Sequence, residues 1–205
     1  MMDIKKGYID TTTFKAAQTL FQSYSTLQSN VTLEKTLKTI LDSLDLTIKE
    51  YGDVREIYNN IILKNYPNEL AVKSSFINNV LSKSDNHVTI FELPIGNSRI
   101  DLCKINGSSM AFEIKTDLDN LSRLDKQLND YSEIFEKVFV ICSLNKLPEI
   151  EKMVSASCGI YTYSIRNGYY KFQLSKKATE SNALNAKKQL NIFRKQELIS
   201  HFKIS

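Results

Sequence analysis

Two neighbouring stretches decide the fold of this chain: Ile100-Asp-Leu-Cys-Lys-Ile105 and Met110-Ala-Phe-Glu-Ile-Lys115. Each has the length and the apolar content that are typical of a β-strand. Asn106-Gly107-Ser108 lies between them and has the composition of a tight turn. We therefore expect an antiparallel hairpin with a three-residue loop.

The length of this loop fixes which residues of the hairpin face each other. A three-residue loop places Asp101 opposite Glu113 on one face of the sheet, with their Cβ atoms about 5 Å apart. Lys115 follows Glu113 by two residues and projects to the same side. A two-residue loop would send the two carboxylates to opposite faces. The three-residue loop also leaves the other face apolar, with Ile100 opposite Ile114 and Leu102 opposite Phe112.

Two carboxylates and a lysine in this arrangement suit metal-dependent hydrolysis of a phosphodiester bond. Asp101 and Glu113 offer oxygen ligands to a divalent cation, and the Lys115 ammonium can stabilise charge or orient the attacking water. The structural alternative is a solvent-exposed face of a half-buried sheet, on which the three residues pair with one another for solubility.

Polar residues on two predicted helices point to the same place. Gln127 and Tyr131 are four residues apart, on the apolar stripe of a helix expected at 122–136. Polar groups within such a stripe need partners, and the charged end of the hairpin is the nearest candidate. Glu69 shares a helix face with apolar residues, which makes it a candidate third acidic group, although the helix dipole alone would favour an acid in a first turn.

The hairpin is expected within a mixed α/β fold that has helices at both ends. Helical periodicity covers residues 12–30 and 32–51, and the capping residues Asp53 and Asn68 predict two further helices, to residues 66 and 81. Alternation at 87–93 predicts a strand. The other expected elements are a helix opened by Ser122 and Asp125, strands at 138–142, 159–165 and 169–174, a short helix from Pro148, and helices from 179 to 202 with a break near Asn191.

Composition narrows the class of protein. The 205 residues are 42% hydrophobic and 10% aromatic, which suffices for a buried core. Cys103, Cys142 and Cys158 form no CxxC pair, so we expect reduced core thiols in a cytoplasmic protein and no zinc. No apolar run approaches the length of a membrane span. His87 and His201 lie in no metal-binding cluster, and the sequence has no phosphate-binding glycine loop.

The ordered set of Glu69, Asp101, Glu113-Ile114-Lys115 and Gln127-x-x-x-Tyr131 resembles the PD-(D/E)xK nuclease superfamily. The similarity is to the branch with a QxxxY motif, as in RecB-type and Cas4-type nucleases, and to small bacterial or phage-borne members without assigned substrates. It covers roughly residues 68–165, and Phe193-Arg-Lys-Gln-Glu-Leu198 is similar to the C-terminus of those small proteins. One departure is Ile100, which stands where the motif has proline.

This resemblance implies a restriction-endonuclease-like mixed β-sheet flanked by helices. It implies that Asp101 and Glu113, assisted by Glu69, bind Mg²⁺ or Mn²⁺. It also implies that Lys115 activates water, and that Gln127 and Tyr131 order the site or contact nucleic acid. We expect a helical N-terminal region at 1–66, the nuclease-like core at 67–175 and a basic helical tail at 176–205.

The C-terminal tail carries most of the excess positive charge. Between Lys171 and Ser205 there are eight lysines and arginines against two glutamates. The tail is either a solvated helical face or a surface for phosphates. The candidates for nucleic-acid contact are Lys176, Lys177, Lys187, Lys188, Arg194 and Lys195.

The sequence thus predicts a metal-dependent nuclease acting on DNA rather than RNA, with the N-terminal helices as a candidate surface for a homodimer or a partner protein. Two alternatives stay open: a catalytically silent nuclease-like module that binds nucleic acid or another partner, and an RNase effector.

Overall fold

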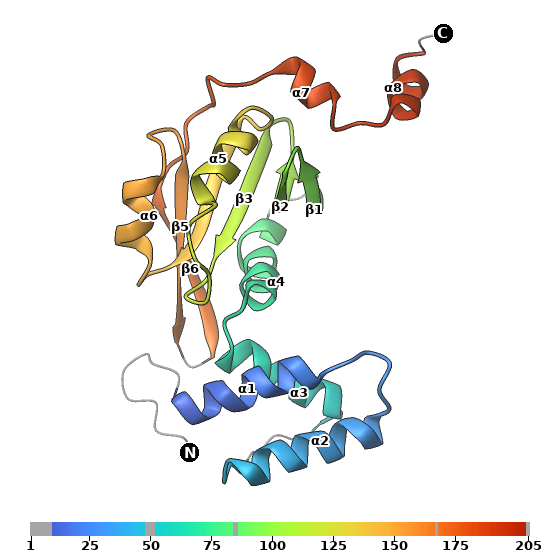
Figure 1. Cartoon of the computed structure of the whole chain (residues 1–205), viewed down its shortest axis with the longest axis vertical. Coiled ribbons are helices and arrows are strands. Elements are labelled where there is room, and N and C mark those ends of the chain that lie inside the picture. The colour runs from blue at the N-terminus through green and yellow to red at the C-terminus, as the bar shows by residue number, and fades with distance from the viewer. Residues whose placement is uncertain (1–9, 48–51, 84–85, 167, 204–205) are drawn as a thin grey trace. The chain divides into compact units, whose positions relative to one another are not determined.

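The computed structural model describes residues 10–47, 52–83, 86–166 and 168–203 (Figure 1). The chain forms two compact units. The first comprises Met1–Val72 with Ile165–Lys171, and the second comprises Lys73–Ser164 with Phe172–Ser205. The region boundaries expected from the sequence, after residues 66 and 175, remain predictions. Among the described residues, no helix is both long and apolar enough to cross a membrane.

Most of the described part of the first unit consists of three helices: α1 (Thr11–Ser23), α2 (Asn30–Ser43) and α3 (Val54–Asn65). Each begins at a side-chain cap, supplied by Asp10, Ser29 and Asp53, which accepts a backbone N–H of the first turn. The apolar stripes of the helices meet in a core whose fully buried members include Ala17, Leu20, Leu33 and Tyr58.

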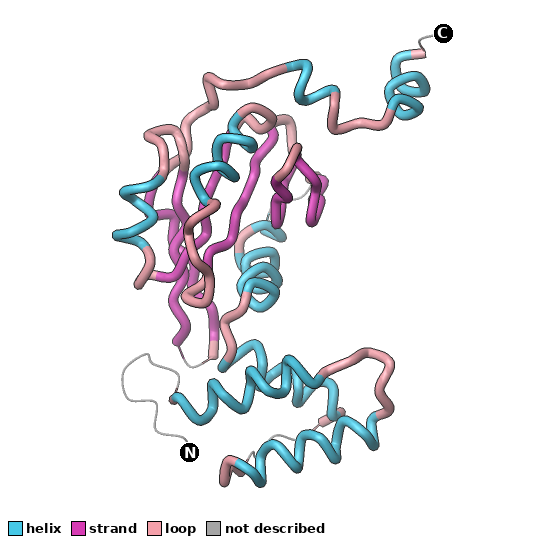
Figure 2. Tube along the Cα trace, in the orientation of Figure 1, coloured by secondary structure: helices cyan, strands magenta, loops and turns pink. Residues whose placement is uncertain are grey.

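Most of a six-stranded sheet lies in the second unit (magenta in Figure 2). Its strands follow one another in chain order. The first three strands are antiparallel, and the third, fourth and fifth are parallel. The sheet is therefore mixed, as the sequence predicts. Its strands are β1 (Val88–Ile95), β2 (Ser98–Ile105), β3 (Ser109–Lys115), β4 (Lys137–Ser143), β5 (Gly159–Arg166) and β6 (Tyr169–Lys176).

Different helices cover the two faces of this sheet. On one face, α5 (Leu124–Ser132) and α6 (Leu147–Met153) pack on apolar side chains of β3, β4 and β5. On the other face, Phe76 of α4 (Glu69–Asn79) contacts the rings of Phe112, Tyr161 and Phe172. A single 3₁₀ turn, η1 (Leu81–Lys83), follows α4. Strand β4 is buried along almost its whole length, as expected for a strand that is covered on both faces.

The C-terminal tail consists of α7 (Ala186–Leu190) and α8 (Lys195–Phe202), so the predicted break near Asn191 is confirmed. The prediction that helix begins at residue 179 is wrong. The backbone N–H groups of Thr179, Ser181 and Asn185 donate to carbonyls of other segments, so they are not available for a helix. No residue of α7 or α8 is buried.

Four predicted helix boundaries also need correction. Helix α1 ends at Ser23 rather than near residue 30, because Tyr24 is extended. Helix α5 begins at Leu124 without a cap from Ser122, whose hydroxyl donates to Asn120 Oδ1 (2.7 Å). Helix α5 ends at Ser132 and not at Glu136, where the chain is already entering β4. The predicted helix at 32–51 corresponds to α2, which already ends at Ser43, and residues 48–51 lie outside the described part of the chain.

Candidate functional site

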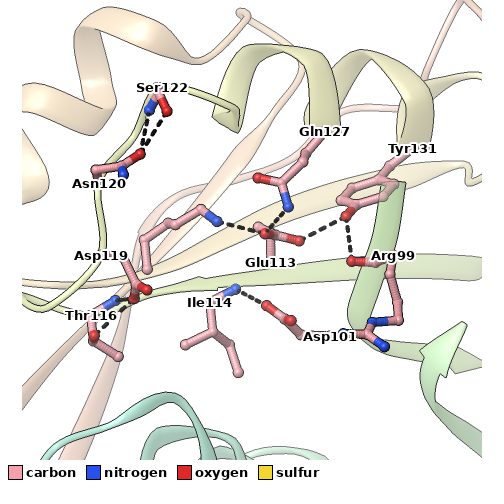
Figure 3. Close-up of polar contacts among 11 residues, drawn as sticks. Arg99, Asp101, Glu113, Ile114, Thr116, Asp119, Asn120, Ser122, Gln127 and Tyr131 are labelled. Carbon is pink, nitrogen blue, oxygen red and sulfur yellow. Dashed lines mark hydrogen bonds and ion pairs between the residues drawn. The ribbon is translucent and has the colours of Figure 1, made fainter. Parts of the chain in front are cut away.

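The β2–β3 hairpin has the predicted register, and it opens at the position of Asp101. Ile105 pairs with Ser109 and Leu102 pairs with Phe112, which is the pattern of a three-residue loop. At the next position, the Asp101 carboxylate accepts a hydrogen bond from the backbone N–H of Ile114 at 2.7 Å (Figure 3). The Asp101 carboxylate therefore accepts a β3 backbone N–H that would otherwise face the backbone of β2. This hydrogen bond holds the carboxylate between the two strands.

Glu113 is the centre of the hydrogen-bond network at this site. Its side chain is almost fully buried, and the residue is only 1% exposed. Lys115 Nζ and Gln127 Nε2 both donate to Glu113 Oε1, at 2.7 Å and 2.6 Å. The Tyr131 hydroxyl lies 2.9 Å from Glu113 Oε2 (Figure 3). The structure thus brings together four residues that the sequence predicts in one site, from β3 and from α5.

Tyr131 is fully buried and acts as a hydrogen-bond donor. Its hydroxyl also lies 2.9 Å from the backbone carbonyl of Arg99, so a single proton serves two acceptors. Burial raises the pKa of Tyr131 far above its ordinary value, and the negative charges of Glu113 and Asp101 raise it further. The phenol therefore stays protonated, and it links β2 to β3 through Arg99 and Glu113.

The donor set of the site suits a hard divalent cation. Asp101 and Glu113 are both buried, and their oxygens are the ligand type that Mg²⁺ and Mn²⁺ prefer. Gln127 Oε1 is a buried acceptor that has no hydrogen-bond partner in the part of the chain that the structure describes. It offers one more oxygen beside the carboxylates. The residues present therefore fit Mg²⁺ or Mn²⁺.

Glu69 is the first residue of α4 and is exposed. It belongs to the first unit, and its role as a metal ligand remains a prediction.

The sequence reasoning missed Glu92 on β1. Phe91 pairs with Leu102 and Leu93 pairs with Ile100, so Glu92 occupies the position across from Asp101. A carboxylate oxygen of Glu92 lies within 4.8 Å of one of Asp101. Its φ of +53° is left-handed, which is uncommon for a residue other than glycine and cannot be read from local sequence.

Two cations flank the Glu92 carboxylate. Buried Lys73 of α4 donates to Glu92 Oε1, and Arg99 Nε lies 3.2 Å from Glu92 Oε2. The head group of Arg99 is largely exposed, and its side chain is 69% accessible. No local sequence pattern predicts these two ion pairs, because Glu92 lies on β1 whereas Lys73 lies on α4 and Arg99 lies on β2.

The loop after β3 has structural contacts that account for its polar residues. Asp119 Oδ2 accepts from the backbone N–H and the hydroxyl of Thr116, both at 2.8 Å. Asp117 accepts from Ser143 and so joins this loop to the end of β4. These contacts give the polar residues of the loop a structural role.

The predicted tail contacts divide into two groups. Lys176 donates to the carbonyl of Ser155, and Lys188 pairs with Glu133, so both are engaged within the protein. The other four side chains are exposed: Lys177, Lys187, Arg194 and Lys195.

The chain has a curated relative, protein cII of Enterobacteria phage P4. The two are 38% identical over 100 residues, which is 49% of this chain but only 38% of the relative. Among solved structures, the Pyrococcus furiosus SfsA complex with Ca²⁺ has a TM-score of 0.33 and 13% identity, over 53% of this chain and 62% of SfsA. A likeness of that size supports no conclusion about fold or function.

The match to a protein family is more extensive. The family described as bacteriophage P4 protein cII matches residues 63–204, which include the whole β2–β3 hairpin, α5 and the tail. The matched region is more than half of the 205 residues. This chain therefore belongs to the bacteriophage P4 protein cII family.

Proposed function

We propose that this protein is a metal-dependent nuclease that hydrolyses phosphodiester bonds, in DNA rather than RNA, with a core of the PD-(D/E)xK type. The observation that carries this proposal is the nearly complete burial of Glu113 against Lys115, Gln127 and Tyr131, next to Asp101. Burying an ion pair generally costs more than it returns in stability. Such a group is therefore better explained by chemistry than by stability.

Each side chain has a distinct role in the proposed reaction. Asp101 and Glu113 hold the cation, and Glu69 is proposed to assist them. Lys115 orients the attacking water and stabilises the charge that develops on the phosphate. Gln127 and Tyr131 fix the Glu113 carboxylate by donating to both of its oxygens. A bound Mg²⁺ or Mn²⁺ would polarise the phosphate and lower the pKa of water.

The basic tail supports nucleic acid as the substrate class. Exposed Lys177, Lys187, Arg194 and Lys195 offer a set of cations for backbone phosphates, which would make binding dependent on salt. The N-terminal helices remain a proposed surface for a second copy of the chain or for another protein.

A second candidate is a nuclease-like module that binds without cleaving. One observation favours it: both oxygens of Glu113 already accept hydrogen bonds from side chains of the site. Calorimetric titration with Mn²⁺ separates the two candidates. A nuclease should give binding heat that Asp101→Ala abolishes, whereas a silent module should give no heat that depends on this carboxylate.

The direct test is incubation of the purified protein with plasmid, linear duplex, single-stranded DNA and RNA in Mn²⁺. We expect Asp101→Ala and Lys115→Ala each to lower the cleavage rate by at least about 100-fold, the size of effect of a positioned catalytic group. Lys137→Ala is the matched control, because Lys137 lies at the opposite end of the parallel β3–β4 pair from Lys115.

Two results would contradict the proposal. One is a wild-type protein that cleaves none of the four substrates, and the other is Lys115→Ala or Asp101→Ala cutting at the wild-type rate. Cleavage restricted to RNA would instead keep the chemistry and replace the substrate, in favour of the RNase alternative. Circular dichroism melts of each variant establish that a lost activity is not a lost fold.

A further inference from the structure

Arg99 is a cation next to the carboxylate site that none of the proposed roles uses. It lies two residues before Asp101 on β2, and its backbone carbonyl is held by the Tyr131 hydroxyl (Figure 3). Its side chain is 69% accessible and its Nε lies 3.2 Å from Glu92 Oε2. Among the described residues, this is the one polar contact that its guanidinium makes. The group is thus fixed at its Nε edge and open at its Nη end.

Glu92 is placed to hold this guanidinium rather than to complete a strand. Its left-handed φ of +53° lies in the middle of β1, across from Asp101. Such a conformation costs roughly 1 kcal/mol or more for a side chain other than glycine. One oxygen of the carboxylate is anchored by buried Lys73, which leaves the second oxygen for Arg99.

The chemistry of the guanidinium identifies the ligand. Arginine presents a planar fork of donors, and the Nη1–Nη2 edge matches two oxygens of one phosphate. We propose that Arg99 binds a backbone phosphate of the nucleic acid adjacent to the phosphate that is cleaved, and that Glu92 positions it. This inference rests on the proposed function, because the neighbouring phosphate must lie at the Asp101–Glu113 site.

A purely stabilising role does not account for the arrangement. Exposed ion pairs contribute about 0–1 kcal/mol, and the Arg99–Glu92 pair is exposed on both sides. That contribution does not exceed the cost of the left-handed backbone at Glu92, which the pairing with buried Lys73 also offsets, so stability does not require the Arg99 contact. The pair places the guanidinium at Glu92, whose carboxylate lies within 4.8 Å of the buried Asp101 carboxylate.

The test measures binding separately from cleavage. Fluorescence anisotropy follows a fluorescein-labelled DNA duplex with Ca²⁺ in place of Mn²⁺, and a gel of the recovered duplex checks that it is intact. We expect Arg99→Ala to weaken binding about tenfold, the value of a charge-assisted hydrogen bond, and to lower the slope of log K against log salt by about one. Arg99→Lys should recover part of the affinity. Lys152→Ala, which removes an exposed lysine of α6, should change little.

A double-mutant cycle tests the positioning role of Glu92. Glu92→Gln should weaken duplex binding, and the Glu92→Gln/Arg99→Ala protein should bind no more weakly than Arg99→Ala alone, because Glu92 acts through Arg99. Additive losses would overturn the positioning role.

The outcomes separate this inference from the proposed function. If the wild type cleaves and Arg99→Ala binds with wild-type affinity and salt slope, the Arg99 role is wrong and the nuclease proposal stands. If the wild type binds without cleaving in Mn²⁺ and Arg99→Ala binds weakly, the Arg99 role stands and the nuclease proposal fails. A wild type that neither binds nor cleaves overturns both.

Discussion

The carboxylate site and the C-terminal tail are both rich in charge, but they hold it in opposite ways. Glu113 is 1% exposed and accepts from three side chains, whereas the lysines of α7 and α8 project from helices that bury no residue. A buried charge has a fixed position and depends on its partners. A solvated charge depends on the salt around it. The effects of substitutions in the two regions should therefore differ: large losses of stability at the carboxylate site, and changes in salt-dependent binding in the tail.

The largest effect on stability is expected for Glu113→Ala. The change leaves the Lys115 ammonium, whose side chain is 11% exposed, without its carboxylate. Breaking a buried pair in this way costs about 3–5 kcal/mol. Urea denaturation monitored by circular dichroism measures this loss in the free energy of unfolding. Glu113→Gln is the matched control, since glutamine keeps the shape of the side chain and should lose less stability. Equal midpoints for Glu113→Ala and the wild type would show that burial of charge does not distinguish the two regions.

Tyr131→Phe should have an intermediate effect. It removes only the hydroxyl that joins Arg99 on β2 to Glu113 on β3. Leaving these buried acceptors without their donor costs about 1–3 kcal/mol. Urea denaturation curves measure this loss of stability. The control is Tyr169→Phe, because Tyr169 is 75% exposed. A loss no larger than that of the control would mean that the hydroxyl contributes nothing to the site.

In the tail, the pair of substitutions Lys187→Ala and Lys195→Ala should change binding and not stability. Each lysine that contacts a phosphate contributes about 0.9 to the slope of log K against log salt. The double variant should therefore lower the slope by up to about two and weaken duplex binding severalfold at low salt. Anisotropy titrations at several salt concentrations measure this. An unchanged slope would exclude the tail from the nucleic-acid interface.

The smallest effect is expected for Lys188→Ala. Lys188 pairs with Glu133, but the two side chains are 51% and 33% exposed. Such pairs contribute between 0 and about 1 kcal/mol to folding. Thermal denaturation at low and at 1 M salt should differ little between this variant and the wild type. A loss comparable with that of Glu113→Ala would show that the Lys188–Glu133 pair anchors the tail.

Local features of the sequence were enough to predict the hairpin and the residues that meet on it. A turn of fixed length and the two-residue period of a strand set the register, so Asp101, Glu113 and Lys115 could be placed before any long-range contact was known. Helical spacing likewise placed Gln127 and Tyr131 on one stripe, and both contact Glu113.

Helix boundaries were less predictable, because neighbouring segments compete for the same backbone groups. Residues 179–185 have no helix since their N–H groups donate to Ser157, Glu136 and Glu133. Glu136, predicted as the end of a helix, instead accepts from the backbone N–H of Ser109 at 2.6 Å. These bonds join residues far apart in sequence, and no local pattern encodes them.

Periodicity and turn length are enough to predict the mixed α/β class, the hairpin register and the set of Asp101, Glu113, Lys115, Gln127 and Tyr131. The surroundings of Asp101 depend instead on contacts between elements that are far apart in the sequence. The left-handed Glu92, its anchor Lys73 and the open guanidinium of Arg99 meet through contacts between α4, β1 and β2. A backbone conformation that local propensity disfavours is kept only when such contacts hold it in place.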